Sequence, residues 1–281
     1  MRNGRSQCTD LAGMTIENDT GSENAGLVEP EVARIETLIN SPQMRDMRRH
    51  GPKHGPMRPR NAATLVIVDG NAGNYRILMG KRNQNLKFMP GALVFPGGSV
   101  DRSDGSVPAA DDMNPVTEDR IVAGLRGKPT RRAARALGMA AVRELAEESG
   151  LIIGKEAPVT MDHPGWEDFA RAGLVPSLAG LSLLARAITP PGPPRRFDTW
   201  FFVTHSSSIR HQPASGFDPS GELENLQWIR PEDAINGDTR EITRVMLVEL
   251  MNRLKKDPGL DPAFPAPFYF ARQKRFQKTI I

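Results

Sequence analysis

Three glutamates, Glu144, Glu147 and Glu148, lie at the i, i+3 and i+4 positions of a predicted helix. Residues 133–149 are mostly Ala, Leu, Met, Arg and Glu, which favour helix formation, and Gly150 is well placed to end the helix. At about 100° per residue, the three carboxylates fall within roughly one 100° sector. Like charges at this spacing repel each other, whereas a hard divalent cation prefers several oxygen ligands and negative charge. The spacing therefore predicts a divalent metal site.

A second feature lies upstream, in the stretch Gly91–Asp101. Its apolar residues 92–95 predict a short strand, which Pro96 interrupts before Gly97 and Gly98. Glycines permit tight turns and let another group approach the backbone closely. The stretch is therefore predicted to be a strand that ends in a tight turn.

Together the two segments resemble the box that defines the Nudix hydrolase family. The pattern of that box is Gly, five residues, Glu, seven residues, and then Arg-Glu-apolar-x-Glu-Glu-x-Gly-apolar. Gly98 matches its first glycine, and Arg143–Leu151 matches its second half at every position. The resemblance implies an α/β/α sandwich with a mixed β-sheet. It also implies hydrolysis of a diphosphate linked to another moiety, with Mg²⁺ as cofactor and Mn²⁺ as an alternative.

The chain departs from the box pattern in two ways. Six residues after Gly98 the pattern has Glu, whereas this chain has Asp104, and residues 105–142 intervene where the pattern allows seven residues. Whether Asp101 or Asp104 takes the place of the missing glutamate is left open. The box is thus split by an insertion at about 105–130, whose first part is rich in Asp and Pro. We expect residues 105 to about 128 to form a surface excursion without a regular element, because this composition disfavours one.

The resemblance also implies roles for individual residues. The metal ligands that it implies are the box glutamates and one backbone carbonyl: Glu144, Glu147, Glu148 and Gly98. Arg143 would orient a glutamate by a charge-assisted hydrogen bond. The general base is left open between the box glutamates, above all Glu147 and Glu148, and two residues of a later acidic loop, Glu222 and Glu224.

Basic residues before the glycine turn suggest where substrate phosphates would bind. Lys81, Arg82 and Lys87 lie in this segment, and Arg196 precedes a strongly β-forming stretch. We expect Arg82, Lys87 and Arg196 to contact substrate. The spacing of 78–80, Lys87, Gly91 and 95–98 is similar to an extra signature of coenzyme A diphosphatases within the family, although Lys87 stands where that signature has Arg.

The elements that would position these residues are expected in one domain over residues 59–256. Strands are predicted at 63–69, 75–80, 92–95, 181–188, 196–205 and within 222–229. Helices are predicted at 133–149, 164–172 and 241–254. Residues 1–58 are expected to lie outside the core with one short helix at 28–39, and residues 257–281 to form a loosely packed tail.

Composition limits the kinds of partner. The net charge is +4 and the sequence pI about 9.4, with basic residues concentrated in 45–60 and 272–278. These segments lack interleaved aromatic residues, so they are interpreted as a solvated linker and tail rather than a nucleic-acid site. No apolar run reaches the roughly 18 residues that span a membrane, and the N-terminus lacks the apolar core of a signal peptide. Cys8 is the single cysteine, which excludes a disulfide framework.

Two functional classes remain after this reading. The first is a cytoplasmic enzyme that hydrolyses a nucleoside diphosphate derivative or, as a variant, coenzyme A or its esters, with no membrane or nucleic-acid partner and with homodimer formation left open. The second is a Nudix-like module that binds a ligand or RNA without turnover. Loss of catalysis usually appears as loss of a box glutamate, and all three are present. The sequence therefore favours the enzyme.

Overall fold

The computed structural model describes residues 22–42, 45–46, 57–85, 90–127, 129–158, 161–193, 195–217, 221–273 and 275–281. The expectations for residues 1–21, and for most of the basic segment 45–60, fall outside these ranges. A short helix is expected at 28–39, and the structure has a longer helix there, α1 (Ser22–Ile39). Its residues Ile35 and Ile39 are buried, so this part of the extension belongs to the core.

A mixed nine-stranded sheet forms the centre of the molecule, in the order β11-β10-β7-β8-β1-β2-β3, with β4 paired to β1 and β9 paired to β2. Strands β1 and β8 are parallel, as are β7 and β10, whereas the other pairs are antiparallel. The strands are β1 (Arg60–Asp69), β2 (Arg76–Arg82), β3 (Leu93–Val94), β4 (Gly97–Ser99), β7 (Ser182–Ile188), β8 (Phe197–His205), β9 (Leu223–Ile229), β10 (Pro267–Arg272) and β11 (Arg275–Ile280). A separate small sheet joins β5 (Gly154–Lys155) to β6 (Val175–Pro176).

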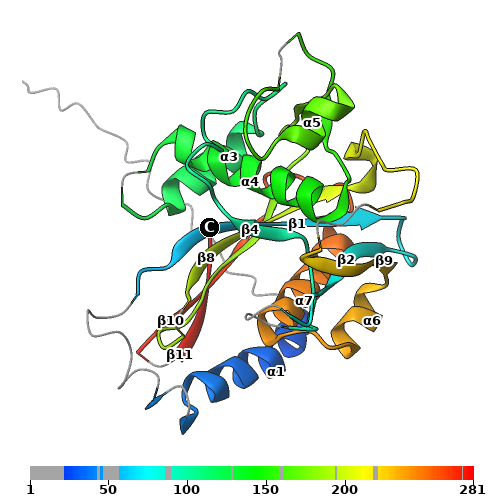
Figure 1. The fold of residues 1–281 in the computed structure, drawn as a ribbon. Helices are drawn as coiled ribbons and strands as arrows, with labels where there is room; N and C mark the ends of the chain where they lie inside the picture. Colours follow the sequence, from blue (N-terminus) through cyan, green and yellow to red (C-terminus); the bar gives the residue numbers. More distant parts are fainter. Residues whose placement is uncertain are drawn as a thin grey trace, which may run out of the picture.

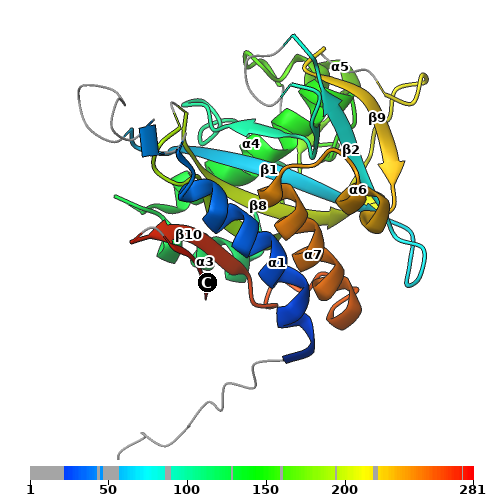
Figure 2. The same ribbon diagram turned by 90° about the horizontal axis from the view of Figure 1, so that it is seen from below.

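Helices cover both faces of the large sheet (Figure 1). One face carries α3 (Pro115–Gly124), α4 (Arg131–Ser149) and α5 (Glu167–Ala172), and the other carries α1, α6 (Pro231–Asn236) and α7 (Glu241–Lys256). Figure 2 shows α1 and α7 side by side on their face. Each face has its own core of buried apolar side chains, because the strands between them are apolar on both sides. The predicted α/β/α sandwich with a mixed sheet is therefore confirmed.

The insertion does not form the surface excursion that its composition suggested. It contains α3, whose N-cap Asn114 accepts a hydrogen bond from the N–H of Val116 and which has proline in its first turn. Val107, Met113 and Ile121 are buried in the core beneath α4. The expectation that residues 105–128 lack a regular element and lie outside the core is wrong, since a few well-spaced apolar residues outweigh the Asp and Pro content.

We therefore expect Ile121→Ala to destabilise the protein by about 2–4 kcal/mol, because it leaves a cavity around a fully buried side chain. Val116→Ala on the same helix is the matched control, since Val116 is 41% exposed and its truncation leaves no cavity. Urea unfolding followed by circular dichroism measures both. Equal stabilities of the two variants would contradict the assignment of the insertion to the core.

The C-terminal residues also differ from their expected state. Residues 267–280 form the β10–β11 hairpin, and β10 extends the sheet by pairing with β7. Tyr269 is fully buried, and Arg120 of α3 donates hydrogen bonds to backbone carbonyls of residues 262–264. The prediction of a loosely packed tail is wrong. Its parallel pairing to a strand about 80 residues away leaves no local signal in the sequence.

Candidate functional site

Helix α4 is fixed at both ends by capping residues. The side chain of Thr130 accepts a hydrogen bond from the N–H of Ala133, and Gly150 ends the helix in the left-handed region at φ 74°. Its apolar face packs on β1 and β8 as part of the core. The helix turns Glu144, Glu147 and Glu148 away from that face, toward β4 and the edge of the sheet formed by β2 and β9.

The glycine turn lies directly against two of these glutamates. The N–H of Gly97 donates to Oε2 of Glu148 at 2.9 Å. A Cβ atom at Gly98 would lie 2.5 Å from the carboxylate of Glu144, so a side chain at this position would collide with it. Glycine at this position lets the backbone of β4 lie against the Glu144 carboxylate without displacing it. The two segments that carry the sequence pattern thus meet in space, although residues 105–130 separate them in the chain.

Arg143 organises the group by using all five of its N–H donors. Nε and Nη2 donate to the two carboxylate oxygens of Asp104 at 3.0 and 3.2 Å. The second N–H of Nη2 donates to the carbonyl of Ser99, and Nη1 donates to Glu144 at 2.8 Å and to Glu147 at 3.2 Å. No donor is left for a substrate. Arg143 is consequently a positioning residue that holds two glutamates and the β4 backbone in place.

Asp104 is the partner that anchors this arginine. It is fully buried, and its Oδ2 also accepts the N–H of Asp101 at 2.8 Å. Of the two aspartates that were left open, Asp104 is thus the one that contacts the box arginine, and Asp101 contributes a backbone donor. The sequence feature that points to Asp104 is its position six residues after Gly98, where the box pattern has glutamate.

The glutamates carry shifted pKa values because they are buried together. Burial raises the pKa of Glu144 to about 7, and the charges of Glu147 and Glu222 add to the rise while Arg143 opposes it. Burial also raises the pKa of Glu148 to about 8, with Glu144 and Glu222 adding to it and Gly97 and Arg82 opposing it. Burial raises the pKa of Glu147 as well, against the attraction of Arg143.

The glutamate carboxylates provide some, but not all, of the oxygen ligands that a hard divalent cation requires. Among the described residues, no three His, Cys, Asp or Glu side chains are close enough together to hold a metal ion as they stand. Magnesium, however, is commonly held by one or two carboxylates together with substrate phosphates and water. Glu144 and Glu148 supply two such carboxylates beside the Gly97–Gly98 backbone, while Glu147, which is 38% exposed, is held by Arg143. These residues supply part of the oxygen ligands that a divalent cation requires, and substrate and water would complete its coordination.

Two further predicted residues lie near this group. The exposed Glu222, just before β9, is close enough for its charge to raise the pKa of both Glu144 and Glu148. Arg82 at the end of β2 lies 3.8 Å from Glu222 and lowers the pKa of Glu148 by its charge. Glu224 is one step further along β9, half-buried and paired in register with Lys81.

Comparisons with known proteins find relatives that are named as Nudix hydrolases or acyl-coenzyme A diphosphatases. No protein-family model matches it. It is 28% identical over 189 residues to nudix hydrolase 7 of Caenorhabditis elegans, covering 63% of this chain and 53% of that protein. It is 26% identical over 245 residues to human acyl-coenzyme A diphosphatase NUDT19, covering 64% of each. The box and these relatives support the assignment of this chain to the Nudix family. It spans less than two thirds of the length of these curated relatives.

A crystal structure of a NUDIX hydrolase from Alicyclobacillus acidocaldarius aligns with 72% of this Nudix chain and 85% of that one, at 22% identity and a TM-score of 0.46.

Not every residue predicted from the sequence lies in the Nudix site. Lys87 falls outside the described residues. Arg196 is not brought to the glutamates, because its Nε donates to the carbonyl of Thr189 at 3.0 Å and its Nη1 to the carbonyl of Met57 at 2.7 Å. It fixes the chain before β1 to the loop before β8. The prediction that it contacts substrate finds no support in this geometry.

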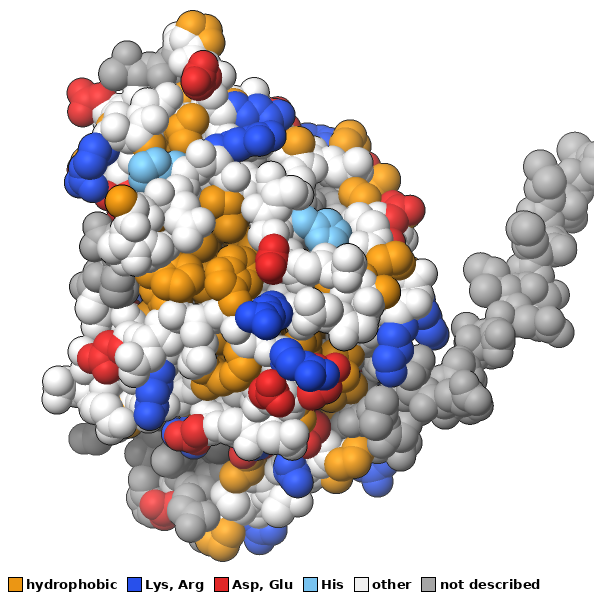
Figure 3. All heavy atoms as spheres, turned by 90° about the vertical axis from the view of Figure 1, so that its right-hand side faces the viewer, with side chains coloured by type: hydrophobic (Ala, Val, Ile, Leu, Met, Phe, Trp, Pro, Cys, Tyr) orange, Lys and Arg blue, Asp and Glu red, His pale blue; other side chains and the backbone are white. Residues whose placement is uncertain are grey.

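The surface carries charged side chains of both signs (Figure 3). On the face in Figure 3, basic and acidic side chains are interspersed around an apolar centre rather than separated by sign. Within the described part of the chain, no helix has the length and apolar character needed to cross a membrane.

Proposed function

We propose that this chain hydrolyses a diphosphate linkage in a nucleoside diphosphate derivative, with Mg²⁺ bound at Glu144 and Glu148 and assisted by Glu147. The observation that carries the proposal is the meeting of the buried Glu148 and the half-buried Glu144 with the Gly97–Gly98 backbone. When bound, Mg²⁺ would stabilise charge on the phosphate oxygens and acidify a coordinated water.

The protein residues take distinct roles in this proposal. Glu144 and Glu148 are the residues that would hold the cation, beside the Gly97–Gly98 backbone. Arg143 and Asp104 hold the glutamates in position and do not touch substrate. Arg82 lies beside Glu222 at 3.8 Å, and its guanidinium is the group proposed to pair with a substrate phosphate. Glu222 is proposed, ahead of Glu224, to accept a proton from the attacking water, because its charge acts on both Glu144 and Glu148.

A coenzyme A substrate is the second candidate. It is favoured by the similarity to the human relative that is named an acyl-coenzyme A diphosphatase. It also agrees with the basic segment before the glycine turn, which would receive the additional 3′-phosphate of coenzyme A. A charge-assisted contact of this kind contributes about 1.5–3 kcal/mol, or roughly one to two powers of ten in specificity.

A panel of diphosphates tests both candidates. Coenzyme A, an acyl-coenzyme A, ADP-ribose, dinucleoside polyphosphates and NADH are incubated with Mg²⁺, and the products are identified by mass. Preference for coenzyme A over its 3′-dephospho form supports the second candidate, and cleavage of ADP-ribose alone excludes it. Tight binding without turnover of any member would instead support a non-catalytic binding module.

The stability of the metal-free protein is expected to fall as the pH rises. Glu144 and Glu148 have folded-state pKa values of about 7 and about 8, above the ordinary value of 4.5. From about pH 4.5 to 8 the folded state therefore keeps protons that the unfolded state has released, so rising pH favours unfolding, by an amount on the order of a few kcal/mol in total. Thermal unfolding in EDTA across this range measures the effect.

The matched variant for this prediction is Glu148→Gln, which removes one of the titrating groups and should flatten the pH dependence. Added Mg²⁺ should stabilise the wild type more at high pH than at low pH, because the ion binds the ionised carboxylates. Parallel pH profiles for wild type and variant would contradict the burial of an ionisable pair at this site.

A further inference from the structure

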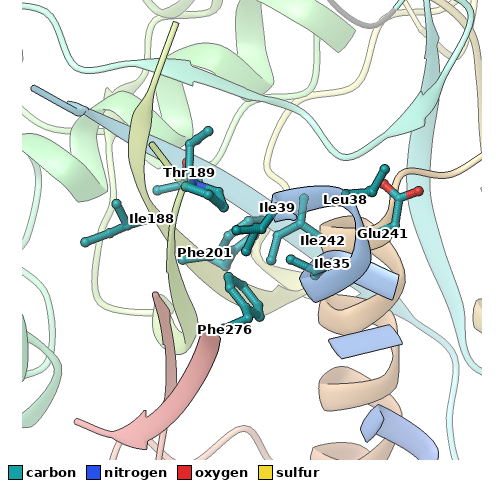
Figure 4. Close-up of a pocket in the computed structure, with 12 residues that line it drawn as sticks. Ile35, Leu38, Ile39, Ile188, Thr189, Phe201, Glu241, Ile242 and Phe276 are labelled. Atoms are coloured by element: carbon teal, nitrogen blue, oxygen red, sulfur yellow. The ribbon is translucent and has the colours of Figure 1, made fainter. Parts of the chain in front are cut away.

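An apolar cavity of about 210 Å³ lies on the face of the sheet opposite the Nudix site (Figure 4). Its walls come from five elements, α1, α7, β7, β8 and β11, and from the loop that follows β7. The labelled apolar side chains from these elements point toward one another: Ile35, Ile39, Phe201, Ile242 and Phe276. The cavity is therefore separate from the residues assigned to hydrolysis, which lie beyond the sheet beside α4.

A void of this kind needs an explanation. Protein interiors pack with few spaces larger than a water molecule. An apolar cavity of about 150 Å³ in another protein stays dry and binds benzene. By proportion, 210 Å³ corresponds to an apolar group of about eight carbon atoms. Water gains little in this cavity, since Thr189 and Thr199 are its few polar lining residues apart from one carboxylate.

That carboxylate defines the charge of the occupant. Among the described residues that line the cavity, Glu241 is the one ionisable side chain, and Figure 4 shows it at one end beside Leu38. Leu38 is 45% exposed, so this end opens toward solvent. An anionic head group at the opening would be repelled by Glu241, whereas a protonated amine would be attracted.

We propose that this cavity binds a small single-chain amphiphile with an aliphatic tail of about eight carbons and an amine head group that pairs with Glu241. The tail fills the space between α1 and the sheet, and the head group remains at the opening. The site does not depend on the proposed hydrolase activity, because none of its lining residues belongs to the Nudix site.

Three probes of equal chain length test the proposal: octan-1-amine, octan-1-ol and octanoate. Isothermal titration calorimetry with the full chain should give the tightest binding for the amine, at least about tenfold tighter than for octanoate. In Glu241→Gln this difference should shrink to less than about threefold. Glu232→Gln is the matched control, because Glu232 also lies in the first turn of a helix but does not line this cavity, and it should keep the full difference.

Two further variants locate the binding site. Ala187→Leu adds volume to a buried lining residue, and Leu38→Trp covers the opening from an exposed helical position where the substitution is easily accommodated. Each of these substitutions should abolish binding of octan-1-amine. Leu38→Trp keeps the test valid if Ala187→Leu does not fold. Absence of binding by all three probes, tighter binding of octanoate, or unchanged binding in Leu38→Trp would each overturn the proposal.

Discussion

Replacing Glu148 by glutamine is expected to lower kcat by at least about 100-fold with the fold intact. Glu148 is 3% exposed and accepts a hydrogen bond from Gly97, so it lies at the meeting point of the helix and the glycine turn. Glutamine has nearly the same shape and can still accept that hydrogen bond, but it lacks the negative charge that a magnesium ion requires. A loss of 100-fold corresponds to about 2.7 kcal/mol of transition-state stabilisation, which is within the several kcal/mol that a catalytic metal contributes.

The experiment compares steady-state kinetics of Glu148→Gln and of a control on the best substrate from the panel, at saturating Mg²⁺. Glu156→Gln serves as the control, since Glu156 is exposed and follows β5, outside the glutamate cluster. Circular dichroism establishes that both variants are folded. A rate for Glu148→Gln within about threefold of wild type would rule out the metal assignment.

The helix that carries these glutamates could be predicted because its signals are local. Its composition, the spacing of its apolar residues and Gly150 at its end are all contained within about 20 residues of sequence, and α4 spans Arg131–Ser149 against the expected 133–149. The strands β1, β7 and β8 were predictable for the same reason, since each is a run of β-branched, aromatic or aliphatic residues.

Features that depend on long-range packing could not be predicted in this way. Helix α3 is recognisable only once Ile121 is seen to be buried under α4, because the surrounding Asp and Pro residues resemble those of a loop. Strand β10 exists through its pairing with β7, and its sequence gives no indication of that partner. The expectations for α3 and β10 are wrong because they rest on composition, whereas tertiary contacts determine the structure of these two segments.

In the candidate site, too, some residues follow from local sequence patterns and others depend on the pairing of distant strands. The glutamates and Gly98 follow from two short sequence patterns, whereas the contribution of Glu222 depends on β9 pairing with β2, about 140 residues away. Arg196 was selected by its charge and its position before a strand, yet its side chain turns to two backbone carbonyls. A charge near a predicted strand end therefore identifies a candidate, and the strand pairing determines whether it reaches the site.

Replacing Asp104 is expected to affect both stability and turnover. Asp104 and Arg143 form a buried pair joined by two hydrogen bonds, and neutralising Asp104 leaves Arg143 with only the more exposed carboxylates of Glu144 and Glu147 as charged partners. We expect Asp104→Asn to destabilise the protein by about 3–5 kcal/mol. It should also reduce kcat, because Arg143 then holds Glu144 and Glu147 less firmly. Asp112→Asn is the control, since Asp112 is a highly exposed partner of Arg135 and surface pairs of this kind contribute only about 0–1 kcal/mol.

A conservative variant separates the effect on positioning from the effect on folding. Asp104→Glu keeps the charge and restores the residue type that the Nudix box has at this position, so it should recover much of the stability. Its longer side chain would move Arg143 and with it the two glutamates, so kcat should recover less than stability does. Chemical denaturation and kinetics on the three Asp104 and Asp112 variants measure both quantities. If Asp104→Asn unfolded at the same urea concentration as wild type, the buried pair would have no anchoring role in this fold.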